Sequence, residues 1–86
     1  MIIKNVVVEG IERIEGNRKT DGKHFGFWKL YGLGEYPFKS SSNEGLKAYT
    51  FNMSDKQFEE STVGLRSLVD LYVKGNDVCE FVCENA

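Results

Sequence analysis

Between His24 and Leu33, aromatic rings and a lysine occur at every second position. The segment has strong β-propensity, so alternate side chains should point to opposite faces of one strand. One face would hold Phe25, Phe27, Lys29, Tyr31 and Leu33, and the other His24, Gly26, Trp28, Leu30 and Gly32. Because a lysine is costly to bury in a small core, we expect the first face to point outward. Exposed rings can stack on unpaired bases while lysines contact phosphates. The alternative is that the same rings fill the core of a small barrel.

The turn that precedes this segment is basic. Residues 16–23 are dense in turn formers and include Arg18, Lys19 and Lys23. The net charge of the chain is −2, but residues 13–47 carry seven basic and four acidic side chains, whereas residues 48–86 carry three and seven. Local charge of this sign would attract a polyanion to the first half of the chain, although it could also be ordinary solvated charge.

Side chains that commonly perform catalysis are few and form no known motif. His24 is the single histidine, and no motif ties it to a serine or a cysteine. The glycines form no phosphate-binding loop. Cys79 and Cys83 would lie roughly 13 Å apart on a strand, which is too far for a disulfide, and the pair lacks zinc-site spacing. We therefore expect no enzyme activity, no cofactor, no metal and no small-molecule substrate.

The composition is that of an ordinary folded protein, with 41% hydrophobic and 28% charged residues and a single proline. A chain of 86 residues predicts one domain over its whole length, 1–86. No apolar run approaches the roughly 20 residues that cross a bilayer, and the first residues do not resemble a signal peptide. We expect a cytoplasmic protein that does not contact membranes.

The remaining pattern predicts four more strands and one short helix. A first strand, 2–15, should bend or bulge at Gly10, and residues 34–45 should form an irregular loop that carries Tyr36 and Phe38. Ser54 can cap a helix of two turns at most, after a strand over 46–53. Residues 68–74 and 78–84 alternate about a Gly-Asn-Asp turn, which indicates a hairpin. In it Val69, Leu71, Val73, Cys79, Phe81 and Cys83 should face the core, and Asp70, Tyr72, Lys74, Glu80 and Glu84 the solvent.

This order of elements favours an all-β fold, a five-stranded OB-like Greek-key barrel with one short helix between strands 3 and 4. We assign Trp28, Phe51, Phe58 and Phe81 to its core. An SH3-like barrel or another small Greek-key barrel would also fit the order.

Two features resemble the small single-stranded DNA-binding proteins of filamentous phages and related mobile elements. One is the basic turn 16–23 that follows a strand ending in glycine and leads into Phe25 and Phe27; the other is the closing segment 69–81. Together with the first strand, 2–15, they cover about half of the chain. The acidic net charge, and Glu80 and Glu84 on the outer side, depart from the strongly cationic grooves of that family.

The resemblance implies a homodimeric OB-type barrel that coats single-stranded DNA without sequence preference. Arg18, Lys19 and Lys23 would contact phosphates, and Phe25, Phe27 and Tyr31 would stack on bases. With Lys29, Tyr36 and Phe38 added, these residues form the candidate nucleic-acid site. RNA could replace DNA as the ligand. The alternative is a protein–protein interaction or dimerisation module that binds no nucleic acid.

Overall fold

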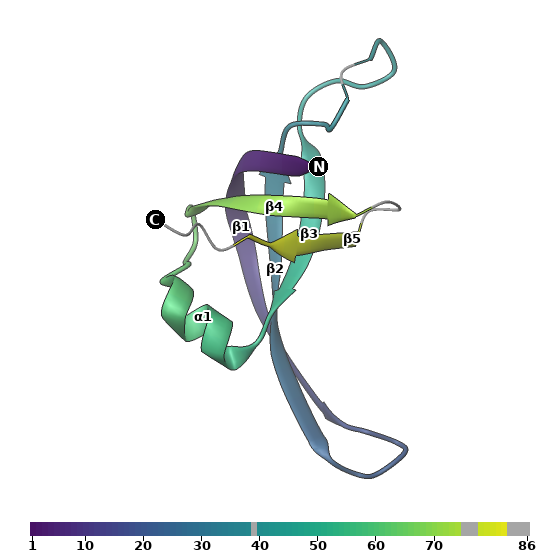
Figure 1. Ribbon diagram of the computed structural model, residues 1–86, viewed down its shortest axis with the longest axis vertical. Helices are drawn as coiled ribbons and strands as arrows, with labels where there is room; N and C mark the ends of the chain where they lie inside the picture. The colour runs from purple at the N-terminus through teal and green to yellow at the C-terminus, as the bar shows by residue number, and fades with distance from the viewer. Residues whose placement is uncertain (39, 75–77, 83–86) are drawn as a thin grey trace.

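The five strands close into a barrel in the order β1-β2-β3-β5-β4, with β4 pairing back to β1 (Figure 1). This computed structural model describes residues 1–38, 40–74 and 78–82. The elements are β1 (Ile2–Asn17), β2 (His24–Gly34), β3 (Lys47–Met53), α1 (Asp55–Ser61), β4 (Leu68–Lys74) and β5 (Val78–Phe81). The β3–β5 pair is parallel and the other pairs are antiparallel. The predicted OB-like barrel, with its helix between strands 3 and 4, is confirmed.

The strand β1 pairs with two neighbours, because it is long and changes direction along its length. It pairs with β4 along Ile2–Val7 and with β2 along Val7–Asn17. Its register shifts between Val8 and Gly10, which confirms the predicted irregularity at Gly10. A second shift lies between Ile3 and Val6, where Asn5 has φ 60° and its N–H donates to Asp70 Oδ1 at 3.2 Å. These irregularities curl β1 around the barrel.

The core is formed by one face of each strand, as alternation predicts. The buried residues are Ile3, Val6, Val8, Leu30, Tyr49, Phe51, Met53, Val69 and Leu71. Trp28, Phe58, Val73, Cys79 and Phe81 are partly buried and pack against that cluster. Gly32 is required where β1 approaches β2, because a Cβ there would lie 2.6 Å from Val6 Cγ1.

The β1–β2 hairpin extends well beyond the barrel. Pairing of β2 with β3 begins only at Trp28, opposite Met53. On the far side of this pair, in the described part of the chain, β1 and β2 pair only with each other. Residues 14–27 thus form a two-stranded ribbon, here called the ribbon, that projects along the 48 Å long axis (Figure 1).

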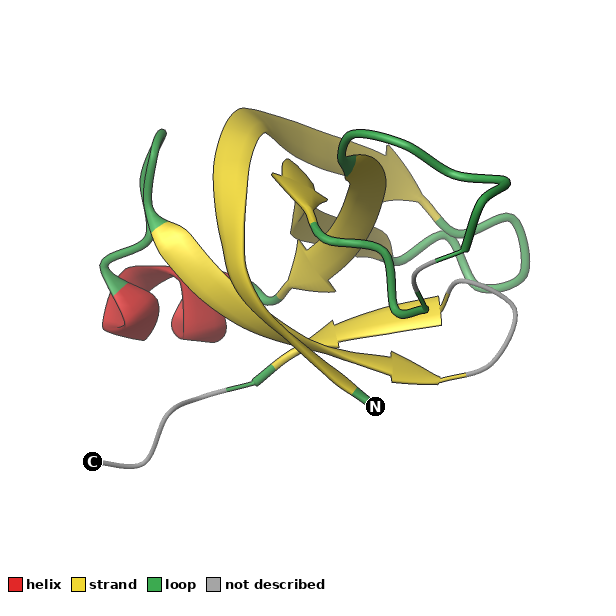
Figure 2. Ribbon diagram, turned by 90° about the horizontal axis from the view of Figure 1, so that it is seen from above, coloured by secondary structure: helices red, strands yellow, loops and turns green. Residues whose placement is uncertain are grey.

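The helix α1 lies to one side of the curled strands (Figure 2), where the ribbon leaves the barrel. Ser54 caps it as predicted: its Oγ accepts the N–H of Gln57, and Gln57 Oε1 accepts the N–H of Ser54. Its seven residues agree with the two-turn limit. Within the described residues, no helix is both long and apolar enough to cross a bilayer.

The closing hairpin is largely as predicted, since β4 spans the expected residues and Tyr72, Lys74 and Glu80 are exposed. Two differences are that β5 ends at Phe81 instead of residue 84 and that Asp70 is half-buried. Asp70 is drawn in because its carboxylate accepts the N–H of Asn5. The predictions for the turn 75–77, for Cys83 with its spacing to Cys79, and for Glu84 lie outside the described residues.

Candidate nucleic-acid interface

The outer face of β2, meaning Phe25, Phe27, Lys29, Tyr31 and Leu33, points away from the core. Phe25 is 36% exposed and Tyr31 is 37% exposed, whereas Leu30 on the other face is fully buried. Phe27 and Lys29 are half-buried. The predicted outward direction of this face is confirmed, and the alternative that these rings fill the barrel core is wrong.

Two of the rings lie over glycines of the opposite strand. Gly16 pairs with Phe25, and a Cβ on Gly16 would come within 3.0 Å of the Phe25 ring. Gly10 pairs with Tyr31, and a Cβ on Gly10 would lie 3.4 Å from that ring. The Phe25 and Phe27 centroids are 6.4 Å apart with planes at 16°. The ribbon therefore presents a nearly parallel pair of rings, of which Phe25 lies over the backbone of Gly16.

Tyr31 is held by a carboxylate that the sequence did not single out. Its hydroxyl donates a 2.6 Å hydrogen bond to Glu12 Oε1, and this bond raises the pKa of Tyr31 above 10.0. Glu12 pairs with Lys29 across the two strands. The Lys29 ammonium lies 5.6 Å from the Tyr31 ring centroid, within cation–π range. The cation and the ring are thus side by side on this face.

The basic turn lies at the far end of the ribbon, where Arg18, Lys19 and Lys23 are all exposed. Arg18 N–H donates to Lys23 O at 2.8 Å, and the turn is made possible by Gly22 with φ 70°. Asp21 accepts the Lys23 N–H and lies 3.9 Å from the Arg18 guanidinium. The ribbon joins these cations to the Phe25 and Phe27 rings, as the sequence predicted.

Tyr36 and Phe38 are not brought together with the basic turn. They lie in the loop between β2 and β3, at the opposite end of the long axis from the ribbon tip (Figure 1). Phe38 is 72% exposed, and Tyr36 lines an apolar groove with Ile2, Leu33 and Leu46. These two residues belong to the same site only for a ligand that follows the whole of β2.

Side chains from β3 and β5 continue the outer face of β2. Lys29 pairs with Asn52, and Asn52 pairs with Glu80. They line a groove together with Phe27, Thr50 and Gln57. Sequence reasoning missed Thr50 and Asn52, although the alternation of β3 places both opposite its buried residues. Glu80, expected to repel DNA, forms a 2.8 Å ion pair with Lys74, which raises the pKa of Lys74.

A cluster at the base of the ribbon, here called the ribbon anchor, ties it to α1. Asp55 accepts hydrogen bonds from the Arg13 guanidinium and, at 3.0 Å, from Trp28 Nε1. Trp28 stacks on Phe58 with centroids 4.4 Å apart, and Arg13 lies 5.3 Å from the Trp28 ring centroid. Sequence reasoning missed Arg13 and Asp55, because no local pattern links residues 42 positions apart.

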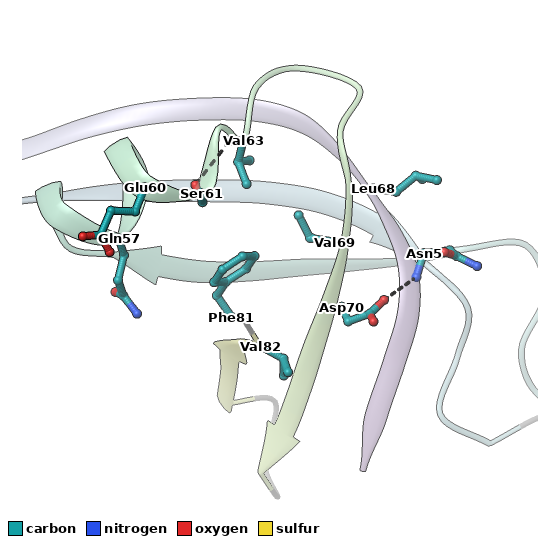
Figure 3. A pocket seen from close by; sticks show the side chains of 10 residues that line it. All are labelled: Asn5, Gln57, Glu60, Ser61, Val63, Leu68, Val69, Asp70, Phe81 and Val82. Atoms are coloured by element: carbon teal, nitrogen blue, oxygen red, sulfur yellow. Dashed lines mark hydrogen bonds between the residues drawn. The ribbon is translucent and has the colours of Figure 1, made fainter. Parts of the chain in front are cut away.

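A second groove opens between α1, β4 and the end of β5 (Figure 3). Val69 and Phe81 contribute apolar surface, and the carboxylates of Glu60 and Asp70 lie among its polar lining. Phosphate groups are disfavoured beside two carboxylates. We therefore do not include this groove in the candidate nucleic-acid site.

Within the ranges that the structure describes, no group of three or more His, Cys, Asp or Glu side chains could hold a metal ion. His24 lies 3.4 Å from the carboxylate of Glu15, on the face of the ribbon opposite Phe25.

Comparisons with protein-family models, curated proteins and solved structures found no match to this chain. The fold is that of a closed, five-stranded OB-like barrel, from which the ribbon projects.

Proposed function

We propose that this protein binds single-stranded DNA, without catalysing a reaction, through the outer face of β2 and the basic turn. One observation carries the proposal: Phe25 and Tyr31 are exposed, and Phe27 is half-buried, on a strand whose other face already supplies the core. Large exposed rings beside a lysine suit unpaired bases. The face that β2 and β3 share is also the surface with which OB folds commonly bind oligonucleotides.

In this mode the bases stack on the rings while the cations follow the backbone. Phe25, Phe27 and Tyr31 would provide the stacking surfaces. Arg18, Lys19 and Lys23 of the basic turn would contact phosphates. Because every base has a π-face, such binding tolerates most sequences. Tyr36 and Phe38 would add contacts only for a strand that runs the length of β2, and single-stranded RNA offers the same ring and phosphate chemistry.

The test is fluorescence anisotropy of a labelled oligothymidine at several salt concentrations. Trp28 is unsuitable as the reporter because it stacks on Phe58, away from the proposed site. Each neutralised phosphate should contribute about −0.7 to the slope of log K against log salt. Replacing both Lys19→Gln and Lys23→Gln should therefore reduce the slope by about 1.4.

Lys4→Gln is the single-charge control, used with an oligothymidine too short to reach the groove that Lys4 and Tyr36 line, because Lys4 is exposed near the start of β1. It should leave the slope unchanged. An oligoribouridine of equal length shows whether RNA binds as well as DNA. Failure of both oligonucleotides to bind at low salt would lead us to abandon the proposal.

A second candidate function, self-association as a homodimer, is favoured by an apolar row on the barrel surface. Val7 pairs with both Leu33 and Leu68, so the three side chains share the outer surface of β2, β1 and β4. Leu33 is 38% exposed and Leu68 is 62% exposed. If this row forms a dimer, Leu33→Ser should yield monomers in size-exclusion chromatography while Phe25→Ala does not. If the protein is only an interaction module that uses the aromatic face, Phe25→Ala should dissociate it and no oligonucleotide should bind.

A further inference from the structure

Three polar side chains form a row across the outside of the barrel. Lys29 of β2, Asn52 of β3 and Glu80 of β5 are paired in register, so they point to the same side of the sheet. With neighbouring strands about 4.8 Å apart, the row spans roughly 10 Å. All three residues line one groove, and Phe27 lies beside them on β2. We call these three residues the polar row.

The polar row offers hydrogen-bond donors at one end and acceptors at the other. Among the described residues, no hydrogen bond or ion pair engages the Lys29 ammonium or the Asn52 amide. Glu80 uses Oε1 to bind Lys74, which leaves Oε2 as an acceptor. The Asn52 amide, which can both donate and accept, lies between them.

The groove wall adds a further donor. Gln57 Oε1 already accepts the N–H of Ser54, so the side-chain oxygen is held toward the start of α1. The amide NH2 of Gln57 is the remaining polar group of that side chain. The groove therefore combines an aromatic ring with several polar groups, a combination typical of a site that binds a planar polar ring.

We infer that the polar row is a subsite for one unpaired guanine, an inference that rests on the proposed single-strand binding. Guanine carries the acceptors N7 and O6 at one end and the donors N1–H and N2–H2 at the other. Lys29 is a good donor to O6 and N7. Glu80 Oε2, which Lys74 leaves free, can accept from N2–H2, and Phe27 can stack on the ring.

The other bases fit this arrangement less well. The amino group of adenine lies between N1 and N7, so its donor and acceptors are not at separate ends. Thymine has one N–H between two acceptor oxygens. Cytosine separates donor from acceptor but is a single ring, which spans less of the row. One such subsite gives a modest preference at one position, while stacking elsewhere remains tolerant of sequence.

The experiment compares oligothymidines that carry one central guanine, adenine, cytosine or hypoxanthine. One good base-edge pair discriminates by about 1–3 kcal/mol, so guanine should bind about tenfold more tightly than adenine. Hypoxanthine lacks the amino group at N2 and should lose most of this advantage. Glu80→Gln should reduce the guanine-to-thymine affinity ratio to about one, because an amide places a donor where the carboxylate only accepts.

The matched control is Glu60→Gln, which makes the same charge change on α1 in the second groove and should keep the ratio. Equal affinity for all central bases would overturn the guanine subsite and leave the proposed function standing. A guanine preference that persists in Glu80→Gln would overturn its assignment to the polar row. Absence of binding to every oligonucleotide would overturn both the subsite and the proposed function.

Discussion

The β1–β2 hairpin consists of two halves that differ in what covers them. In the barrel half, each strand has a neighbour on both edges and one face is buried in the core. In the ribbon half, β1 and β2 pair only with each other among the described residues, and the nearest support is the ribbon anchor. An isolated two-stranded hairpin is marginally stable in water. The ribbon therefore depends on cross-strand pairs and on its attachment to α1.

This difference in burial indicates why the ribbon carries aromatic rings. In the barrel half, apolar side chains such as Leu30 and Val8 are explained by burial. In the ribbon half, Phe25 stacks with Phe27 and lies over Gly16, and Phe25 remains 36% exposed. The rings gain some cross-strand contact but fill no core. Their exposure favours a role in binding.

The largest expected effect is on stability, and it separates a truncation on the buried face of β2 from one on its outer face. Leu30→Ala should lower the free energy of unfolding by about 2–5 kcal/mol, because Leu30 is fully buried in the core. Phe25→Ala should lower it by less than about 1 kcal/mol, since only a cross-strand contact is lost. Urea denaturation of both variants measures the difference. Equal losses would contradict the distinction between the two halves.

The sequence predicted the barrel because its strands alternate clearly. In β4 alternation alone placed Val69 and Leu71 inside, whereas β2 carries apolar residues on both faces and Leu30 was placed inside because Lys29 was expected to point outward. The length of the projection could not be predicted in this way. It depends on where β3 stops pairing with β2, at Met53, and this is set by the cap at Ser54 and the packing of α1.

The second-largest expected effect is on the affinity for single-stranded DNA. Phe25→Ala should weaken oligothymidine binding by about 1–3 kcal/mol, which is roughly 5- to 150-fold, because one stacking surface is removed. Anisotropy titration at a fixed low salt concentration measures it. Phe38→Ala, which removes an even more exposed ring at the other end of the molecule, is the control and should leave the affinity for a short oligonucleotide unchanged.

The candidate site was only partly predictable for a related reason. The outer face of β2 and the basic turn are local in the sequence, and the structure places them together. Asn52 and Glu80 join that face only through strand pairing, and their positions relative to Lys29 follow from the register of β3 and β5. The position of Tyr36 and Phe38 at the opposite end from the basic turn likewise follows from the direction of β2.

A smaller effect should follow from loosening the ribbon anchor. Asp55→Asn removes the charge that pairs with Arg13, while the amide oxygen can still accept from Trp28 Nε1. Because the Asp55 side chain is 60% exposed, the loss of stability should stay below about 1 kcal/mol and fade at high salt. Amide hydrogen exchange should increase in the ribbon more than in β4. Equal increases in both would show that the anchor does not act on the ribbon in particular.

The smallest expected effect is a change in the pKa of Tyr31, which lies on the outer face of β2. The hydrogen bond from Tyr31 to Glu12 raises the pKa of Tyr31 in the folded protein. This contact therefore stabilises the fold below the unfolded pKa of about 10, and the contribution is lost as pH rises through the higher folded pKa.

Glu12→Gln should return the pKa of Tyr31 toward 10, because the hydrogen-bonding carboxylate and its charge are both removed. Glu15→Gln, the same change on the opposite face of the ribbon, is the control and should leave that pKa unchanged. The 13C shift of Tyr31 Cζ across the alkaline range gives the pKa, with Tyr31→Phe to assign the signal. If Glu12→Gln produced no decrease, the carboxylate would not be holding the ring, and the stacking surface at Tyr31 would be less ordered than the Phe25 and Phe27 pair.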